Sequence, residues 1–149
     1  KGLDVQDWAI HTIKRIRKHS DRPIVVRAHP GDKAAHQYLN HRTSRLAKIR
    51  GVTISEFGTP LERDMHKAWA VVNHNSSSVV GPIIQGYHSF ITDSKHSQCS
   101  DVSHDDFHRL ESPKEFDRES WLQRISMFHW KFEELSNGTC WRHMRNYCQ

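Results

Sequence analysis

The sequence predicts an α/β protein with a Rossmann-like parallel sheet of about four or more strands, helices on both faces of the sheet, and a C-terminal helical segment. Helical and extended patterns alternate through the first 92 residues. The extended runs are short, β-branched and apolar without polar alternation, which is typical of strands buried on both faces. They are too short and too apolar for hairpins, and turn residues or polar residues follow them.

The first helix–strand pair lies at the N-terminal end. Apolar residues recur at helical spacing from Asp4 to His19, and Asp4 is suited to cap the start of this helix. The run 23–28 is the first predicted strand. It stops at 29–32, where the residue types indicate a tight turn.

The second pair repeats this order. An apolar stripe over 35–49 predicts a helix that Gly51 ends, and 52–54 is the second predicted strand. Thr59 and Pro60 are typical of a further helix start, because threonine caps a helix and proline fits its first position.

Two more strands complete the predicted sheet. Residues 68–72 form the third and lead into the polar segment 73–78, a short helix over 79–85 and a fourth strand at 87–92. We expect the following strand residues to be buried: Val25, Val26, Ile54, Val71, Val72, Phe90 and Ile91.

The pattern changes after residue 92. Residues 93–106 are polar without a period, whereas Asp117 is suited to cap a long helix with an apolar face over 121–135. Asn137 and Gly138 close that helix, and one more short helix is expected over 139–147. We therefore predict one domain, 1–149, made of a leading helix (1–22), an α/β core (23–92) and a polar loop with C-terminal helices (93–149).

Composition and charge narrow the function classes. The chain has 149 residues and a net charge of +5 when its 13 histidines are counted as neutral. This charge suits phosphate-rich partners such as nucleotides or nucleic acid. No apolar run approaches ~18 residues, so no membrane span is expected, and the amphipathic start does not resemble a signal peptide. Three widely spaced cysteines, an odd number, favour a reducing cytoplasm over a disulfide framework.

Two motifs follow predicted strands and carry candidate chemistry. Asn75-Ser76-Ser77-Ser78 opens a predicted helix, where successive N–H groups and hydroxyls suit a phosphate or carboxylate. Plain capping by serine explains the same pattern without a ligand. In Arg27-Ala28-His29-Pro30, the arginine offers a fixed cationic fork and the histidine a donor or proton shuttle, although a histidine before proline is also an ordinary turn residue. A doubly wound sheet would bring both motifs into one crevice.

Together these motifs resemble the C-terminal half of GT-B-type glycosyltransferases. The sequence is most similar to tailed-phage proteins and to capsule-polysaccharide and glycerophosphate-polymer transferases, from about Pro23 onward. The segments of the tail that carry the resemblance are Phe116 to Leu122, His129 to Leu135 and Gly138 to Arg145.

The resemblance implies a domain that holds a nucleotide-sugar donor such as a UDP-sugar, with no other cofactor. Arg27 and His29 would be the catalytic residues beside the donor phosphates, and Asn75, Ser76, Ser77 and Ser78 would bind those phosphates. Thr92, Asp93 and Ser94 would line the base or ribose side.

The chain also departs from the family pattern. Many relatives have an acidic residue after the serines, whereas this chain has Val79-Val80-Gly81-Pro82. It holds no N-terminal acceptor domain of comparable size, so the resemblance implies half of an enzyme, a fragment or a domain without catalysis. The acceptor would be phage DNA or a glycan, and a retaining or inverting outcome stays open. The alternative function is a non-catalytic nucleotide- or nucleic-acid-binding module.

Other chemistry-bearing residues have plainer explanations. Zinc is compatible with Cys140, His143 and Cys148, or with Cys99, His104 and His108, but neither group contains a paired cysteine knuckle, and we predict no metal site. The adjacent Asp105 and Asp106 are expected to be solvated. The basic run from Lys14 to Lys18 either contacts DNA phosphates or forms a solvated helix face, and Arg42, Arg45, Lys48 and Arg50 add charge.

Overall fold

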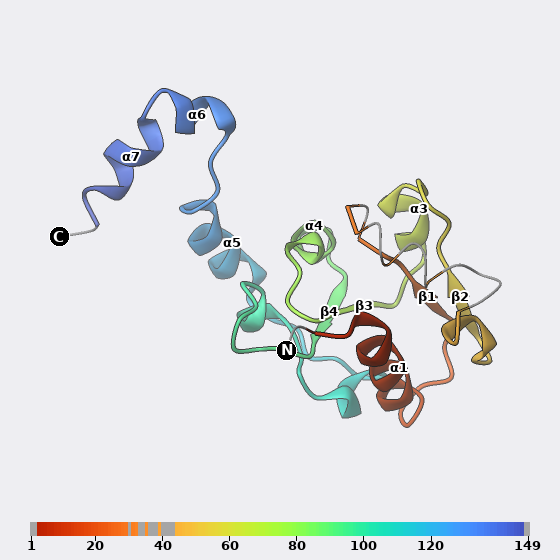
Figure 1. The fold of residues 1–149 in the computed structure, drawn as a ribbon. Helices are drawn as coiled ribbons and strands as arrows, with labels where there is room; N and C mark the ends of the chain where they lie inside the picture. The colour runs from red at the N-terminus through yellow and green to blue at the C-terminus, as the bar shows by residue number, and fades with distance from the viewer. Residues whose placement is uncertain (1–2, 30, 33–34, 36–38, 40–43, 148–149) are drawn as a thin grey trace. The chain divides into compact units, whose positions relative to one another are not determined.

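The structure is a computed structural model that describes residues 3–29, 31–32, 35, 39 and 44–147 (Figure 1). The chain divides into two compact units, which are residues 1–116 (unit 1) and 117–149 (unit 2). Unit 1 contains all the strands of the described chain, and unit 2 is helical.

The strands of unit 1 form two separate parallel pairs. β1 (Ile24–Val26) pairs with β2 (Val52–Ile54), and β3 (Ala70–Asn73) pairs with β4 (His88–Ile91). In the described chain no ladder joins the two pairs, because each is its own two-stranded sheet. The prediction of a Rossmann-like sheet of about four or more strands is therefore wrong.

The prediction failed because the sequence of a strand does not by itself specify which strand it pairs with. Side chains, and not a backbone ladder, connect the two pairs: Ile24 packs against both apolar cores of unit 1, and the Arg22 guanidinium lies 4.5 Å from the centre of the Trp69 ring. An apolar run predicts that a segment is extended, but it does not name the strand that completes its hydrogen bonds.

Helices on both faces were also expected, whereas the described residues place a helix on only one face of the β1–β2 pair. Val25 is 49% exposed and Thr53 is exposed, whereas Ile54, the last residue of β2, is buried in the core. Of the other strand residues expected to be buried, Phe90 and Ile91 are, whereas Val26, Val71 and Val72 are half-buried. The β1–β2 pair therefore alternates between a covered and an exposed face.

Helix α1 (Val5–Ile16) covers the inner face of the β1–β2 pair. Its N-cap is Asp4, whose carboxylate accepts from the Asp7 backbone N–H at 2.9 Å. Its apolar stripe packs with the strands into one core, whose buried members are Ala9, Ile10, Ile13, Ala35, Leu39, Leu46 and Ile54. Seven of the 15 residues in the helix predicted over 35–49 lie outside the described residues, and its described end is the 3₁₀ turn η1 (Leu46–Lys48).

The second core of unit 1 surrounds β4. Phe90 is fully buried there with Ile16, Phe107 and Leu110. The segment around His104 adds a third extended stretch beside β4, because His104 N–H donates to Ser89 O and Ile91 N–H donates to His104 O, both at 2.8 Å. The remaining short elements of unit 1 are α3 (Leu61–Met65), η2 (Ser77–Val79), α4 (Val80–Ile84), η3 (Ser100–Val102) and η4 (Phe107–Arg109).

Unit 2 contains α5 (Arg118–Ser126), α6 (Phe132–Ser136) and α7 (Thr139–Met144). The single long helix predicted from Asp117 is thus two helices. A new start interrupts it, because the Glu134 carboxylate accepts from the Lys131 backbone N–H at 2.8 Å. Its apolar face is buried only in part, since Trp121 is buried whereas Phe128 is 65% and Phe132 90% exposed.

None of the described helices has the length and the apolar character that a membrane crossing requires.

The buried imidazole of His104 makes the stability of unit 1 pH-dependent. Its ring lies between Phe90 and Phe116, with ring centres 4.9 and 4.7 Å away, and Nε2 has no hydrogen-bond partner. Burial lowers the His104 pKa; a hydrogen bond to the Lys114 backbone opposes this, and the nearby positive charges add to the lowering. The unfolded chain therefore binds this proton more tightly than the folded one, so stability falls as the pH drops below the ordinary histidine value of about 6.5.

We expect the urea midpoint of the wild type to fall between about pH 8 and about pH 5, and we expect His104→Phe to reduce that fall because phenylalanine cannot be protonated. The measurement is urea unfolding followed by circular dichroism at both pH values. His11→Gln, which replaces an exposed histidine of α1, should keep the wild-type fall. An equal fall in the His104→Phe variant would show that this imidazole does not cause it.

Candidate functional site

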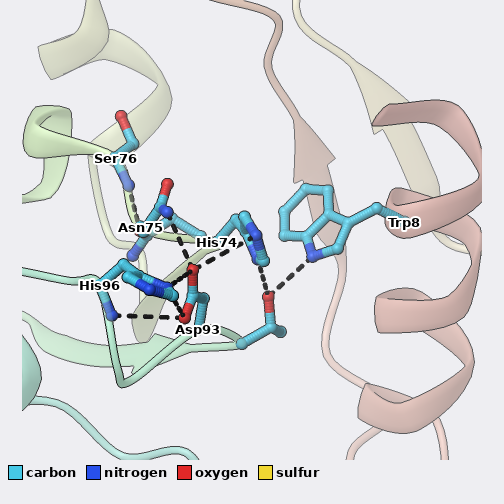
Figure 2. Close-up of polar contacts among 8 residues, drawn as sticks. Trp8, His74, Asn75, Ser76, Asp93 and His96 are labelled. Carbon is cyan, nitrogen blue, oxygen red and sulfur yellow. Dashed lines mark hydrogen bonds and ion pairs between the residues drawn. The ribbon is translucent and has the colours of Figure 1, made fainter. Parts of the chain in front are cut away.

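The candidate site lies at the carboxyl ends of β3 and β4. The parallel register places Asn73 opposite Ile91. The ladder continues past the strands, because Thr92 N–H donates to Asn73 O at 3.1 Å and Asp93 N–H donates to His74 O at 3.2 Å. The two loops that leave the strands therefore run side by side, and the Asn75 amide reaches Asp93 Oδ2 at 3.0 Å (Figure 2).

The serine segment begins with two local hydrogen bonds that shape its turn. Asn73 Oδ1 accepts from the Ser76 N–H at 2.9 Å, and Ser76 Oγ accepts from the Ser78 N–H at 3.2 Å. Ser76 thus caps η2, which is the ligand-free explanation of this motif. Ser77 and Ser78 are exposed. The hydroxyls of Ser76 and Ser78 lie 2.9 Å apart, so one donates to the other.

Asp93 is the centre of the site's charged groups. Its two carboxylate oxygens each lie 3.0 Å from His96 Nδ1, and Oδ2 is 3.7 Å from His74 Nε2 (Figure 2). Partial burial raises the Asp93 pKa, but the hydrogen bonds and positive charge of His96, with the bond from Asn75, hold it below its ordinary value. Asp93 is therefore a carboxylate at neutral pH.

The Thr92 hydroxyl links the His74 ring to Trp8 of α1. Trp8 Nε1–H donates to Thr92 Oγ1 at 2.8 Å, and Thr92 Oγ1 lies 2.8 Å from His74 Nδ1 (Figure 2). In a neutral His74 ring, an unprotonated Nε2 would place its lone pair beside the Asp93 carboxylate, which is unfavourable. The ring proton is therefore on Nε2, the nitrogen nearer to Asp93. Nδ1 then accepts from the Thr92 hydroxyl.

Arg27 and His29 follow β1 and have different partners. Arg27 Nη1 lies 2.6 Å from Asp64 Oδ2, which also accepts from the Ser55 hydroxyl at 2.6 Å. This ion pair joins the ends of β1 and β2 to α3. His29 Nδ1 accepts from the Gly31 N–H at 3.1 Å, so the proton of its neutral ring is on Nε2 and His29 is a donor there.

The structure therefore brings together only part of the predicted site. Asn75, Ser76, Thr92 and Asp93 are close around the ends of β3 and β4, and Ser94 is exposed beside them. Arg27 and His29 contact residues of the β1–β2 half, and Pro30 lies outside the described residues.

Three residues of the cluster escaped the sequence prediction. His96 had a signal, since a residue three positions after an aspartate often donates its N–H to that carboxylate, as His96 does at 3.3 Å. His74 stood inside the polar segment without a motif of its own. Trp8 was assigned only to the apolar stripe of the first helix, and nothing in the sequence points to Thr92, which is 84 residues away.

Half of the basic run on α1 serves the fold. Arg17 donates to the carbonyls of Ser20, Arg22 and Gly51. Arg15 lies over the Phe107 ring at 4.3 Å. Lys14 and Lys18 are exposed, as both interpretations of the run require, and Arg42 lies outside the described residues.

The histidines and cysteines do not assemble into a metal centre within the described part of the chain. No group of three or more His, Cys, Asp or Glu side chains is arranged there to hold a metal ion. Cys99 is buried, and burial raises the pKa of its thiol. Cys140 and His143 lie on α7, while Cys148 lies outside the described residues.

Comparisons with protein-family models, with curated proteins and with solved structures found no match for this chain. The geometry of the site is therefore the basis for its functional interpretation.

The partners of Arg27 generate a stability prediction. Arg27→Ala leaves the half-buried Asp64 carboxylate without its cation, so we expect a loss of about 1–3 kcal/mol in the free energy of unfolding. His29→Ala removes an exposed side chain and should cost about 0.5 kcal/mol or less. Urea unfolding at neutral pH measures both, and equal losses would mean that the Arg27–Asp64 pair does not stabilise the fold.

Proposed function

We propose that this chain binds a nucleoside diphosphate-sugar, as the donor-binding part of a glycosyltransferase. The site is the edge formed by the carboxyl ends of β3 and β4. The proposal rests on this edge and not on a Rossmann-like sheet, which the described chain does not form.

One observation carries the proposal: the Asn75–Asp93 contact at 3.0 Å. It brings the segment suited to the donor phosphates, 75–78, against the segment suited to the ribose or base, 92–94. Parallel strands place their ligand sites at this edge, because the loops after the strands converge there. Segments on either side of one contact are well placed to hold the two ends of a nucleotide.

Each segment contributes groups of the right chemistry. The exposed hydroxyls of Ser77 and Ser78 offer donors to phosphate oxygens. Asp93 is ionised and has capacity for a further hydrogen bond, so it can accept from a sugar hydroxyl. Ser94 is exposed beside it and offers a second hydroxyl.

The two residues implied as catalytic take different parts in this proposal. His29 can donate from Nε2 to a phosphoryl oxygen, which stabilises charge on the leaving diphosphate. The charge of Arg27 is balanced by Asp64, so its part is to hold the ends of β1 and β2.

The acceptor in this proposal is held outside this chain. An acceptor domain would be supplied by a separate protein or by another part of a longer one, and the acceptor would be phage DNA or a glycan. We place the reaction in the cytoplasm, in keeping with the cysteine pattern.

Ser77→Ala tests the phosphate contact without disturbing the turn. Because the capping bond belongs to Ser76, we expect Ser77→Ala to weaken UDP binding by about 2- to 10-fold, the equivalent of one neutral hydrogen bond, with unchanged stability. Ser76→Ala should also lower the free energy of unfolding by about 1 kcal/mol. Isothermal titration calorimetry with UDP and UDP-glucose measures the affinities, and urea unfolding measures the stabilities.

The matched control is Ser112→Ala, which removes an exposed serine hydroxyl outside the site. Absence of UDP binding by the wild type, or equal affinity in the wild type and Ser77→Ala, contradicts the donor site. Binding of short duplex DNA instead, with a salt dependence that Lys14→Gln and Lys18→Gln reduce, would identify a nucleic-acid-binding module.

A further inference from the structure

We propose that Asp93 and His96 form a general-base dyad in which Nε2 of the exposed His96 ring takes a proton from the nucleophile that attacks the bound donor. The dyad deepens the proposed function and rests on it for the identity of the substrate. Which ring nitrogen of His96 is basic follows from the arrangement of the side chains alone, whatever the substrate is.

The direction of the hydrogen bond decides which nitrogen is basic. Asp93 is ionised and can only accept, and both its oxygens lie 3.0 Å from His96 Nδ1. Nδ1 therefore carries the proton of the neutral ring, and Nε2 has the lone pair. The His96 side chain is 65% exposed, so a reactant has access to the ring.

Asp93 is itself held in place, which fixes the orientation of the imidazole. It accepts from the Asn75 amide at 3.0 Å and from the His96 backbone N–H at 3.3 Å. His74 Nε2–H approaches it from the β3 loop at 3.7 Å, and Thr92 fixes that ring. The pKa of Asp93 is lowered, so this group is a carboxylate at neutral pH. An acceptor carboxylate on Nδ1 and a free Nε2 are the features that orient an imidazole as a base.

The chemical step balances with water or an acceptor alcohol as the nucleophile. The O–H proton moves to His96 Nε2 while the oxygen forms a bond to the anomeric carbon of the sugar. The bond from that carbon to the phosphate oxygen breaks, and its electron pair leaves with the nucleoside diphosphate. With water, UDP-glucose and water give glucose, UDP and a proton.

The first experiment tests the dyad without any nucleotide. With p-nitrophenyl acetate, His96 Nε2 attacks the acetyl carbonyl, p-nitrophenolate leaves, and water hydrolyses the acetyl-imidazole to acetate and free imidazole. Relative to the matched control His11→Gln, we expect His96→Gln to slow p-nitrophenolate release by about tenfold. Asp93→Asn should also lower the rate, because the imidazole then loses its carboxylate partner. NMR of the ring nitrogens should show His96 protonated at Nδ1 and bare at Nε2.

Equal rates in His96→Gln and His11→Gln, or a His96 ring protonated at Nε2 and bare at Nδ1, overturn the dyad.

The second experiment measures release of glucose from UDP-glucose without an acceptor, together with UDP affinity by calorimetry. We expect His96→Gln to lose at least tenfold in this hydrolysis with UDP affinity within about twofold of the wild type. Tight UDP binding with equal glucose release in the two proteins overturns the base and leaves the donor site standing. A reactive His96 without UDP binding supports the dyad and overturns the proposed function.

Discussion

The parallel ladder between β3 and β4 is the constraint on which the polar chemistry of unit 1 depends. Its register sets Asn73 against Ile91, and the backbone bonds that follow keep the next residues of both chains adjacent. Because two loops leave the ladder in the same direction, an amide, a carboxylate and two imidazoles gather within hydrogen-bonding range or close to it. A shift of one residue in this register would turn those side chains to opposite faces of the pair.

Local patterns predicted where the strands lie but not how they combine. The predicted runs at 23–28, 52–54, 68–72 and 87–92 each overlap a strand, because side-chain shape is a property of the run itself. The choice of partner depends on tertiary contacts that such runs leave open, which is why two separate pairs replace one sheet. The break between α5 and α6 has a similar origin, since a capping carboxylate three residues along the chain overrides a continuous apolar stripe.

The candidate site shows the same difference between local sequence patterns and tertiary contacts. Asn75 and Ser76 were predicted from their place after an apolar run and Asp93 from the family resemblance, and the ladder brings them together. The partner of Arg27, Asp64, lies 37 residues along the chain on α3, and sequence spacing carries no sign of that pair. The same limit hid the role of Trp8, whose indole looked like one more apolar residue of α1.

The bond from Trp8 to Thr92 has a consequence for biosynthesis. The first helix leaves the ribosome long before the fourth strand, so α1 has to wait for about 80 further residues before its indole meets its acceptor. Contacts of such long sequence separation slow folding, since the intervening loop must close first. A nascent chain stalled before residue 92 therefore lacks the threonine that links the His74 imidazole to α1.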